Sequence, residues 1–286
     1  MQAIMDKKQD ELLNLTGTNY QAQVNLSFLN KRIVIKQYQG SNLSGFVKEL
    51  IAIANSRNLT KIWVKAHAED EEEFKSIGFE SEAVVKAFYG SEDAILMAFY
   101  LTEDRKESQD RRKKEQLISK VKSSEQDDEF TLPAGYNFRI ATENDLAQLS
   151  NLYDDVFTSY PYPIKKEDYL KQMRQKGTIY GVISKEGKIV SAAAAETVAE
   201  YKNAELTDFA THVEHRGQGL AAYLLNRLEK ELKSNNYKSL YTIARANVFG
   251  INKIFSSLNY EYTGRLIQNC NIAGGFEDMN VWSKVI

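Results

Sequence analysis

The feature that most constrains this fold is a glycine-rich junction between a strand and a helix. Residues 204–213 (AELTDFATHV) alternate like a strand, and residues 219–236 carry leucines at helical spacing. Between them stands Arg216-Gly217-Gln218-Gly219. Glycines permit positive φ and close backbone approach to a ligand, while the first amides of a helix favour an anion. The junction therefore predicts an α/β fold that holds a pyrophosphate where this helix begins.

The spacing of the junction differs from that of two common nucleotide loops. No Lys-Ser or Lys-Thr follows the glycines, as it does in a P-loop, and the Gly-x-Gly-x-x-Gly pattern is missing. The alternative interpretation is a tight strand-to-helix turn that binds nothing.

A charge-rich stretch divides the chain. Residues 102–132 contain few apolar side chains, which predicts a linker that is either disordered or a solvated helix. Residues 1–101 then form a smaller N-terminal α/β half-domain. Residues 133–286 form the main domain, in which strand and helix patterns alternate and one hairpin turns at Glu186-Gly187. We expect a mixed central sheet flanked by helices.

The N-terminal part resembles the second half of the main domain. One constant offset places Ser76–Glu80 on Ser257–Glu261 and the helix pattern of residues 46–59 on the helix that ends at Asn236. The same offset places Ile35–Gly40 where the glycine junction stands, and that segment lacks Arg-Gly-x-Gly. We therefore expect no nucleotide in this lobe. It completes a core with the main domain, covers the substrate side or mediates formation of a homodimer.

Composition excludes several functional classes. The 37 Lys and Arg residues are balanced by 39 Asp and Glu, which argues against a nucleic-acid partner bound through a basic surface. With one cysteine and three histidines, neither a disulfide framework nor a metal site is expected, and a reducing compartment, the cytoplasm, is favoured. No apolar run of about 18 residues exists and the start is mixed in charge, so neither a membrane span nor a signal peptide is expected.

Arg216-x-x-Gly219-x-Ala221 resembles the Arg/Gln-x-x-Gly-x-Gly/Ala signature of the GNAT acetyltransferase superfamily, and the order of elements is similar over about residues 135–286. The resemblance implies acetyl-CoA as the acetyl donor. It also implies that the strand before the junction splays open along the pantetheine arm. Asn247 is in addition a candidate helix cap. The implied cofactor-binding residues are Ala210, Thr211, Arg216, Gly217, Gln218, Gly219, Leu220, Ala221, Asn247 and Asn252.

Three further segments, FTSYPYPI (157–164), ELTDFAT (205–211) and GGFEDMNVW (274–282), resemble the β-lysine N6-acetyltransferase family, whose members carry an N-terminal extension of this size. The resemblance implies acetylation of the terminal amine of (3S)-3,6-diaminohexanoate, which yields a compatible solute. The alternatives are a GNAT enzyme for a polyamine, lysine or protein lysine, and a CoA-binding regulatory module without catalysis.

Two carboxylates on the strand before the junction are candidate general bases. They belong to Glu205 and Asp208, which in a regular strand point to opposite faces unless a bulge intervenes. The alternative for each is a solvated strand carboxylate. Where many superfamily members carry a tyrosine acid in the last helix, this chain has Phe255, so no general acid is assigned.

The acceptor carries two amines and a carboxylate. Arg245 lies in an apolar strand and, if buried, needs a partner, which is either the substrate carboxylate or an internal salt bridge. Glu277 and Asp278 are candidates for holding the distal amine. Tyr160 and Tyr162, each followed by proline, are expected to form a rigid aromatic wall over the substrate or to pack a loop onto the core.

Overall fold

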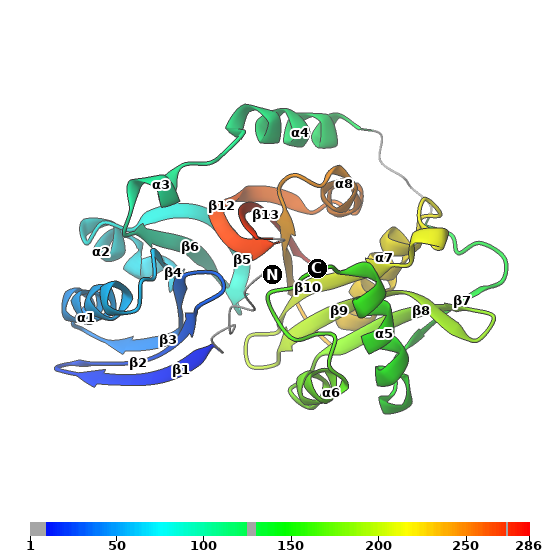
Figure 1. The fold of residues 1–286 in the computed structure, drawn as a ribbon, viewed down its shortest axis with the longest axis horizontal. Helices are drawn as coiled ribbons and strands as arrows, with labels where there is room; N and C mark the ends of the chain where they lie inside the picture. The colour runs from blue at the N-terminus through cyan, green and yellow to red at the C-terminus, as the bar shows by residue number, and fades with distance from the viewer. Residues whose placement is uncertain (1–9, 125–129, 273) are drawn as a thin grey trace, which may run out of the picture.

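The computed structural model describes residues 10–124, 130–272 and 274–286. Two lobes lie side by side, each built around one sheet (Figure 1). The chain start used to judge a signal peptide lies largely outside the described residues, as do linker residues 125–129. Among the helices that are described, none combines the length and the apolar character that crossing a membrane requires.

The N-terminal lobe has a six-stranded sheet with the order β1-β2-β3-β4-β6-β5. Strands β3 and β4 pair in parallel, with α1 as the crossover between them, and the other neighbours are antiparallel. Its elements are β1 (Glu11–Gly17), β2 (Tyr20–Ser27), β3 (Arg32–Gly40), α1 (Leu43–Ser56), β4 (Lys61–His67), α2 (Glu71–Ser76), β5 (Glu80–Tyr89) and β6 (Glu92–Tyr100).

The C-terminal lobe has a seven-stranded sheet with the order β12-β13-β11-β10-β9-β8-β7. This is the predicted mixed sheet flanked by helices, and the hairpin turns at Glu186 and Gly187 as expected. Its elements are β7 (Tyr136–Ile140), α5 (Leu146–Val156), α6 (Glu167–Gln175), β8 (Ile179–Lys185), β9 (Lys188–Val198), β10 (Asn203–Thr211), α7 (Leu220–Ser234), β11 (Ser239–Arg245), α8 (Phe249–Ser257), β12 (Glu261–Ile272) and β13 (Gly275–Val285).

The internal repeat is larger than the sequence pattern predicts. Strands β1 to β6 with α1 and α2 follow one another in the same order as β8 to β13 with α7 and α8, and the strand orders of the two sheets match position by position. The repeat thus includes three strands before the helix, and only β7, α5 and α6 of the C-terminal lobe lack a counterpart.

Helices cover both faces of the C-terminal sheet. Ala193 and Ala195 of β9 pack in the core under α7 and α8, whereas Ala192 and Ala194 pack under α5 and α6. This alternation explains the alanine run, because successive side chains of a strand point to opposite faces. In the N-terminal lobe α1 and α2 cover one face, and the other face meets the C-terminal lobe.

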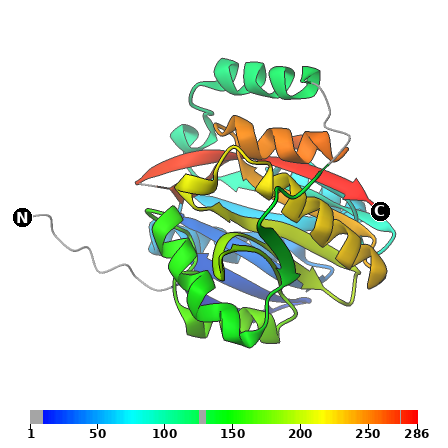
Figure 2. The ribbon, with the colours of Figure 1, turned by 90° about the vertical axis from the view of Figure 1, so that its right-hand side faces the viewer.

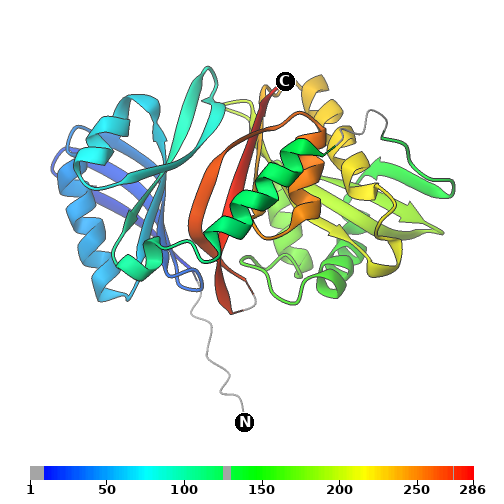
Figure 3. The ribbon, with the colours of Figure 1, turned by 90° about the horizontal axis from the view of Figure 1, so that it is seen from above.

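The contact between lobes is close and polar at its rim. Strand β5 packs against β12 and β13, and in Figure 3 these two strands lie between the lobes. Gly264 allows the approach, since a Cβ there would lie 2.1 Å from the Glu82 carbonyl oxygen. The ammonium of Lys61 donates across the interface to the Ile267 carbonyl oxygen at 2.8 Å. It also donates to Glu82 of its own lobe at 2.9 Å.

The charged segment is not solvated all round, and this corrects the expectation of a linker without packing. It forms α3 (Glu103–Lys106) and α4 (Arg111–Ser123), and α4 lies over α8 and across β12 and β13 (Figures 2 and 3). Ile118 and Val121 enter the core of the C-terminal lobe, while Lys114 pairs with Asp278 at 2.8 Å. Sequence reasoning weighed the many charges and missed one apolar face of a short helix.

Candidate active site

A cavity of about 510 Å³ lies between the lobes, a size typical of small-molecule sites. Strands β3 and β4 form one wall, and β10 and β11 form the other. The charged and aromatic residues that line it include Arg32, Lys36, Trp63, Lys65, Tyr160, Tyr162, Glu196, Glu205, Asp208, Tyr241 and Arg245. The N-terminal lobe thus lines this cavity together with the C-terminal lobe.

A bulge in β10 brings the two candidate bases into one cavity. The register between β9 and β10 shifts between Thr207 and Ala210, and Asp208 adopts φ +53°. Both Glu205 and Asp208 therefore line the cavity, whereas a regular strand would point them to opposite faces. The bulge that would bring the two carboxylates to the same side of the strand is therefore present.

A third carboxylate, which sequence reasoning missed, faces Glu205. Glu196 is its direct cross-strand partner on β9. Burial raises the pKa of Glu196, and the charges of Glu205 and Asp208 raise it further. Burial also raises the pKa of Asp208 to about 6, against the opposing effect of its hydrogen bond from Tyr160. Such a cluster is stabilised by a bound cation, since like charges face each other.

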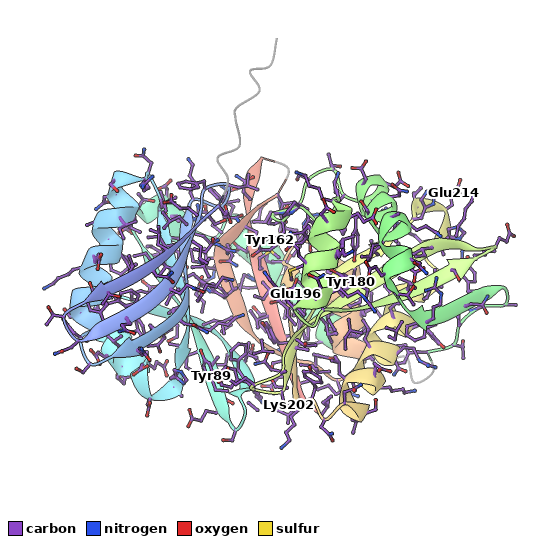
Figure 4. The ribbon with its side chains drawn as sticks, turned by 90° about the horizontal axis from the view of Figure 1, so that it is seen from below. Tyr89, Tyr162, Tyr180, Glu196, Lys202 and Glu214 are labelled. Atoms are coloured by element: carbon purple, nitrogen blue, oxygen red, sulfur yellow. The ribbon has the colours of Figure 1, made fainter. Side chains whose placement is uncertain are left out.

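The two predicted aromatic residues line the same cavity. The hydroxyl of Tyr160 donates to Asp208, and Tyr162 is 44% exposed. In Figure 4, Tyr162 and Glu196 lie in the middle of the molecule, between the lobes, while Glu214 lies toward the far end of the C-terminal lobe. Both tyrosines thus form part of the cavity wall, as one of the two interpretations expected. Tyr160 also packs against the core under α5, as the other expected.

The strand-to-helix junction has the geometry of an anion site. Gly217 and Gly219 have φ values of +76° and +73°, and nothing lies within 4 Å of a Cβ at either position. Helix α7 begins at Leu220 without a side-chain cap. Among the described residues, the first amide at this end with a carbonyl partner is that of Tyr223, which donates to Gly219 at 3.0 Å. The preceding amides are therefore available to a ligand.

The strand before the junction splays, as expected. β10 pairs with β11 only through Asn203, Ala204 and Glu205, so residues 206–211 have no partner on that side. Thr211 is held on β9 by a contact of 2.7 Å with the Ser191 hydroxyl, and its carbonyl oxygen accepts from Arg216 at 3.1 Å. Ala210 is buried in the same strand. Residues 207–209 of β10 and 241–245 of β11 line the cavity, and the chain continues from β10 to the junction before α7.

Of the predicted substrate-binding residues Arg245, Glu277 and Asp278, only Arg245 lines the cavity, and its role toward a substrate stays a prediction. Arg245 is exposed and not buried, and it lines the cavity while its guanidinium binds Glu277 at 2.6 and 2.8 Å. This is the internal salt bridge that was the alternative. Asp278 is buried against Lys114, Ser108 and the amide of Gln268. Neither acid is among the residues that line the cavity.

Two asparagines were expected at the CoA arm. The side chain of Asn252 is buried and fully engaged, with its amide nitrogen donating to Arg245 and Val248 carbonyls and its oxygen accepting from Asn280 and Trp282. It is therefore a structural residue, and the cofactor assignment is corrected.

Asn247 is exposed, and its proposed capping role is wrong because Val248 is the N-cap of α8. Its contact with the CoA arm stays a prediction. Phe255 is fully buried against Phe209 and Tyr260, at 5.6 and 5.1 Å between ring centroids. A buried phenyl ring donates no proton.

Sequence reasoning also missed the contribution of the N-terminal lobe. Arg32, Lys36 and Lys65 line the cavity together with Trp63, which the sequence suggested was only a core residue. A signal was present: Arg32 and Lys36 stand two positions before and two positions after Val34 and are separated by apolar residues, so all three share one face of the strand. Charged residues on a buried face of a strand mark a site or a buried pair.

One group of metal-type ligands occurs outside the cavity. Among the described residues, His212, Glu214 and His215 bring ligand atoms within 4.8 Å of one another in the connection between β10 and α7. The group is exposed or half-buried, and His215 is also bonded to the Tyr136 hydroxyl at 2.9 Å.

Comparison with known proteins bears on this arrangement. The model of the acetyltransferase (GNAT) family matches residues 146–251. The β-lysine N(6)-acetyltransferase of Methanococcus maripaludis is 34% identical over 262 residues, which cover 92% of this chain and 95% of that protein. The chain belongs to the same family, within the GNAT acetyltransferases. The β-lysine N(6)-acetyltransferase of Methanosarcina mazei is also 34% identical, over 83% of this chain and 95% of that protein.

One of the solved structures that match part of this chain contains acetyl-CoA. The protein yncA from Salmonella typhimurium, solved with its cofactor acetyl-CoA, is 16% identical over 53% of this chain and 94% of its own, with a TM-score of 0.46. GNAT acetyltransferases use acetyl-CoA as acetyl donor. The uncapped start of α7 and the splayed β10 fit a pyrophosphate and an extended arm, respectively.

Proposed function

We propose that this chain transfers the acetyl group of acetyl-CoA to the terminal amine of β-lysine. The observation that carries the proposal is the position of the Glu205 and Asp208 carboxylates, which line a cavity that opens between splayed strands leading to the uncapped start of α7. The names of the two archaeal relatives supply the substrate. The product is then a compatible solute, and the single cysteine favours a cytoplasmic setting.

The acceptor amine must lose a proton before it reacts. With a pKa near 10.4, about one alkylamine molecule in a few thousand is neutral at pH 7, a cost of roughly 4–5 kcal/mol. Glu205 and Asp208 are the candidate bases, and the raised pKa of Asp208, about 6, brings it closer to the working pH of a general base. Acetyl-CoA supplies the activated acetyl group as a thioester.

The chain also orients and holds the acceptor. Carboxylates of Glu196, Glu205 and Asp208 attract ammonium groups, and Tyr160 fixes Asp208 through its hydroxyl. The amine lone pair then forms the amide bond as the carbon–sulfur bond breaks. The nitrogen loses two protons in all: the base takes one before the attack, and the other ends on the departing thiolate to give free CoA thiol. No tyrosine acid is required, because a thiolate is a stable leaving group.

The test is release of free thiol from acetyl-CoA with a panel of amines: β-lysine, α-lysine, spermidine and a lysine-containing peptide. The proposal predicts a kcat/KM for β-lysine at least tenfold above every other amine. A preference for spermidine or the peptide would contradict β-lysine as the substrate but would leave the acetyltransferase activity standing. Binding of acetyl-CoA without turnover of any amine would contradict the proposed acetyltransferase activity.

A further inference from the structure

The N-terminal lobe brings a set of cations to the cavity. Arg32 and Lys36 lie on β3, and Lys65 lies on the neighbouring strand β4. The alternation of the strands places all three on the face that is opposite to Ile33, Ile35 and Val64, which pack under α1. These cations therefore belong to the wall of the cavity and not to the core of their own lobe.

Arg32 is buried with unused hydrogen-bonding capacity. Only 5% of it is exposed, and its Nη1 donates to the Asn269 carbonyl oxygen at 2.7 Å. Its Nε is buried without a hydrogen-bond partner. Within the parts of the chain that the structure describes, no carboxylate oxygen lies within 4.0 Å of Arg32, Lys36 or Lys65. Buried guanidinium groups are normally paired with an anion.

Lys65 is held in an aromatic cage. Its ammonium lies 5.0 Å from the ring centroids of Phe88 and Tyr241 and 5.6 Å from that of Trp63. It donates to the Tyr241 hydroxyl at 2.9 Å, and Tyr241 is the register partner of Glu205 on the neighbouring strand. Burial lowers the pKa of Lys65, while the charge of Glu205 opposes this effect. An anion beside Lys65 would compensate its burial further.

The opposite wall carries the opposite charge. Glu196, Glu205 and Asp208 all come from the C-terminal lobe, which also contributes Lys176 and Arg245 to the lining. The carboxylates of the cavity therefore lie on one wall, here called the acidic wall, and the charged residues on the wall of the N-terminal lobe, here called the basic wall, are all cations. A ligand with ammonium groups and a carboxylate at separate ends complements both walls. A plain polyamine leaves the basic wall unpaired, and unpaired buried charges are costly.

Arg245 is a weaker candidate for the same role. Its guanidinium is already engaged with both oxygens of Glu277, and its side chain is 44% exposed. The cations of the N-terminal lobe lack such a partner.

We propose that Arg32 and Lys65, with Lys36 at the more exposed end of β3, bind the carboxylate of the acceptor and so select diamino acids over diamines. This inference rests on the proposed function, because it takes the cavity as the acceptor site. It gives the N-terminal lobe a direct role in specificity. Charge-assisted hydrogen bonds of this kind discriminate by about ten- to a hundredfold.

The experiment compares two acceptors at saturating acetyl-CoA: β-lysine and 1,4-diaminopentane, which is β-lysine without its carboxylate. The variant Lys65→Met keeps the aliphatic stem among the aromatic rings and removes the charge. We expect the ratio of kcat/KM for β-lysine over 1,4-diaminopentane to fall at least tenfold, mainly through the KM for β-lysine. Lys36→Met, at an exposed position, is expected to lower the ratio in the same direction and keeps the test open if Lys65→Met does not fold.

The matched control is Lys122→Met on α4, where the lysine also lies over an aromatic ring, 5.2 Å from that of Tyr262, but outside the cavity. The ratio of kcat/KM for β-lysine over 1,4-diaminopentane should be the same in this variant as in the unmodified chain. An equal loss on both acceptors would show that Lys65 acts only through Tyr241 and Glu205, and would overturn the inference. Absence of turnover of either acceptor by the unmodified chain would instead refute the proposed function, and the inference with it.

Discussion

The two lobes share a sheet topology but differ at the point where the first crossover helix begins. In the N-terminal lobe, Asn42 caps α1, and its side-chain oxygen accepts from the Gly45 amide at 3.0 Å. In the C-terminal lobe, the equivalent helix α7 begins after Gly219, with no side-chain cap. The same end of the same helix is therefore closed by the protein in one lobe and left open for an anion in the other.

The lobes differ again on the faces that they turn to each other. Strands β10 and β11 separate after Glu205, and the gap becomes part of the cavity. The equivalent strands β3 and β4 also stop pairing after Ile35, and they present cations to the cavity where β10 presents carboxylates. The two copies of the repeat thus share the separation of these strands and differ in the charges that they bring to the cavity and in the capping of the helix that follows.

The largest expected effect comes from the acidic wall. Glu205→Gln keeps the shape and the acceptor oxygen that faces Tyr241 but removes the base. We expect kcat/KM for the amine to fall by about 10²- to 10⁴-fold, with acetyl-CoA binding retained. Initial rates and calorimetric CoA binding measure this, with Glu231→Gln on the exposed face of α7 as the control. A loss of less than threefold would remove Glu205 from the list of bases.

The next effect concerns the segment that joins the lobes. Lys114→Met leaves the buried Asp278 carboxylate without its cation, which is expected to cost about 3–5 kcal/mol of folding free energy. Lys113→Met, next along the helix and 78% exposed in its pair with Asp110, is the control and should change stability by less than about 1 kcal/mol. Urea unfolding of both variants measures the difference. Equal midpoints would mean that α4 does not stabilise the fold through this pair.

A smaller effect tests the open helix end directly. Gly219→Asn introduces a side chain that accepts a left-handed backbone and can cap the following amides, as Asn42 does in the other lobe. We expect the KM for acetyl-CoA to rise about ten- to a hundredfold. Gly187→Asn, at φ +79° in the β8–β9 hairpin, is the matched control for backbone strain. Identical KM values for the two variants would contradict an anion site at α7.

The smallest effect is the pH dependence of the acidic wall. Burial raises the pKa of Asp208 to about 6, so its carboxylate is ionised above pH 6 and protonated below it. If Asp208 holds or deprotonates the amine, kcat/KM falls by half near pH 6 and about tenfold per unit below that. The Asp208→Asn variant should lose this limb of the profile. An unchanged limb in that variant would assign it to another group.

The site elements that could be predicted from the sequence are the local ones. The glycine junction, the strand before it and the helix after it follow one another in the chain, so Arg216, Gly217 and Gly219 stand out without any tertiary contact. The hairpin at Glu186 and Gly187 was predictable for the same reason. Short-range backbone geometry leaves a clear mark in the residue types.

The remaining features depend on contacts between distant segments. Lys65 donates to Tyr241, the register partner of Glu205, and no periodicity links these residues. Asp278 was expected to hold an amine because its partner Lys114, in a segment that looked like a linker, was invisible from the sequence. Charged residues on buried strands were correctly seen to need partners, but the sequence does not say whether the partner is substrate or protein.

The most direct test of a divided site is a crystal structure of the complex with CoA and β-lysine. The account predicts the pyrophosphate on the amides of residues 217–222, the terminal amine within hydrogen-bond distance of Glu205 or Asp208, and the carboxylate on Arg32 and Lys65. A carboxylate held by Arg245, with the basic wall of the N-terminal lobe touching only solvent, would contradict it.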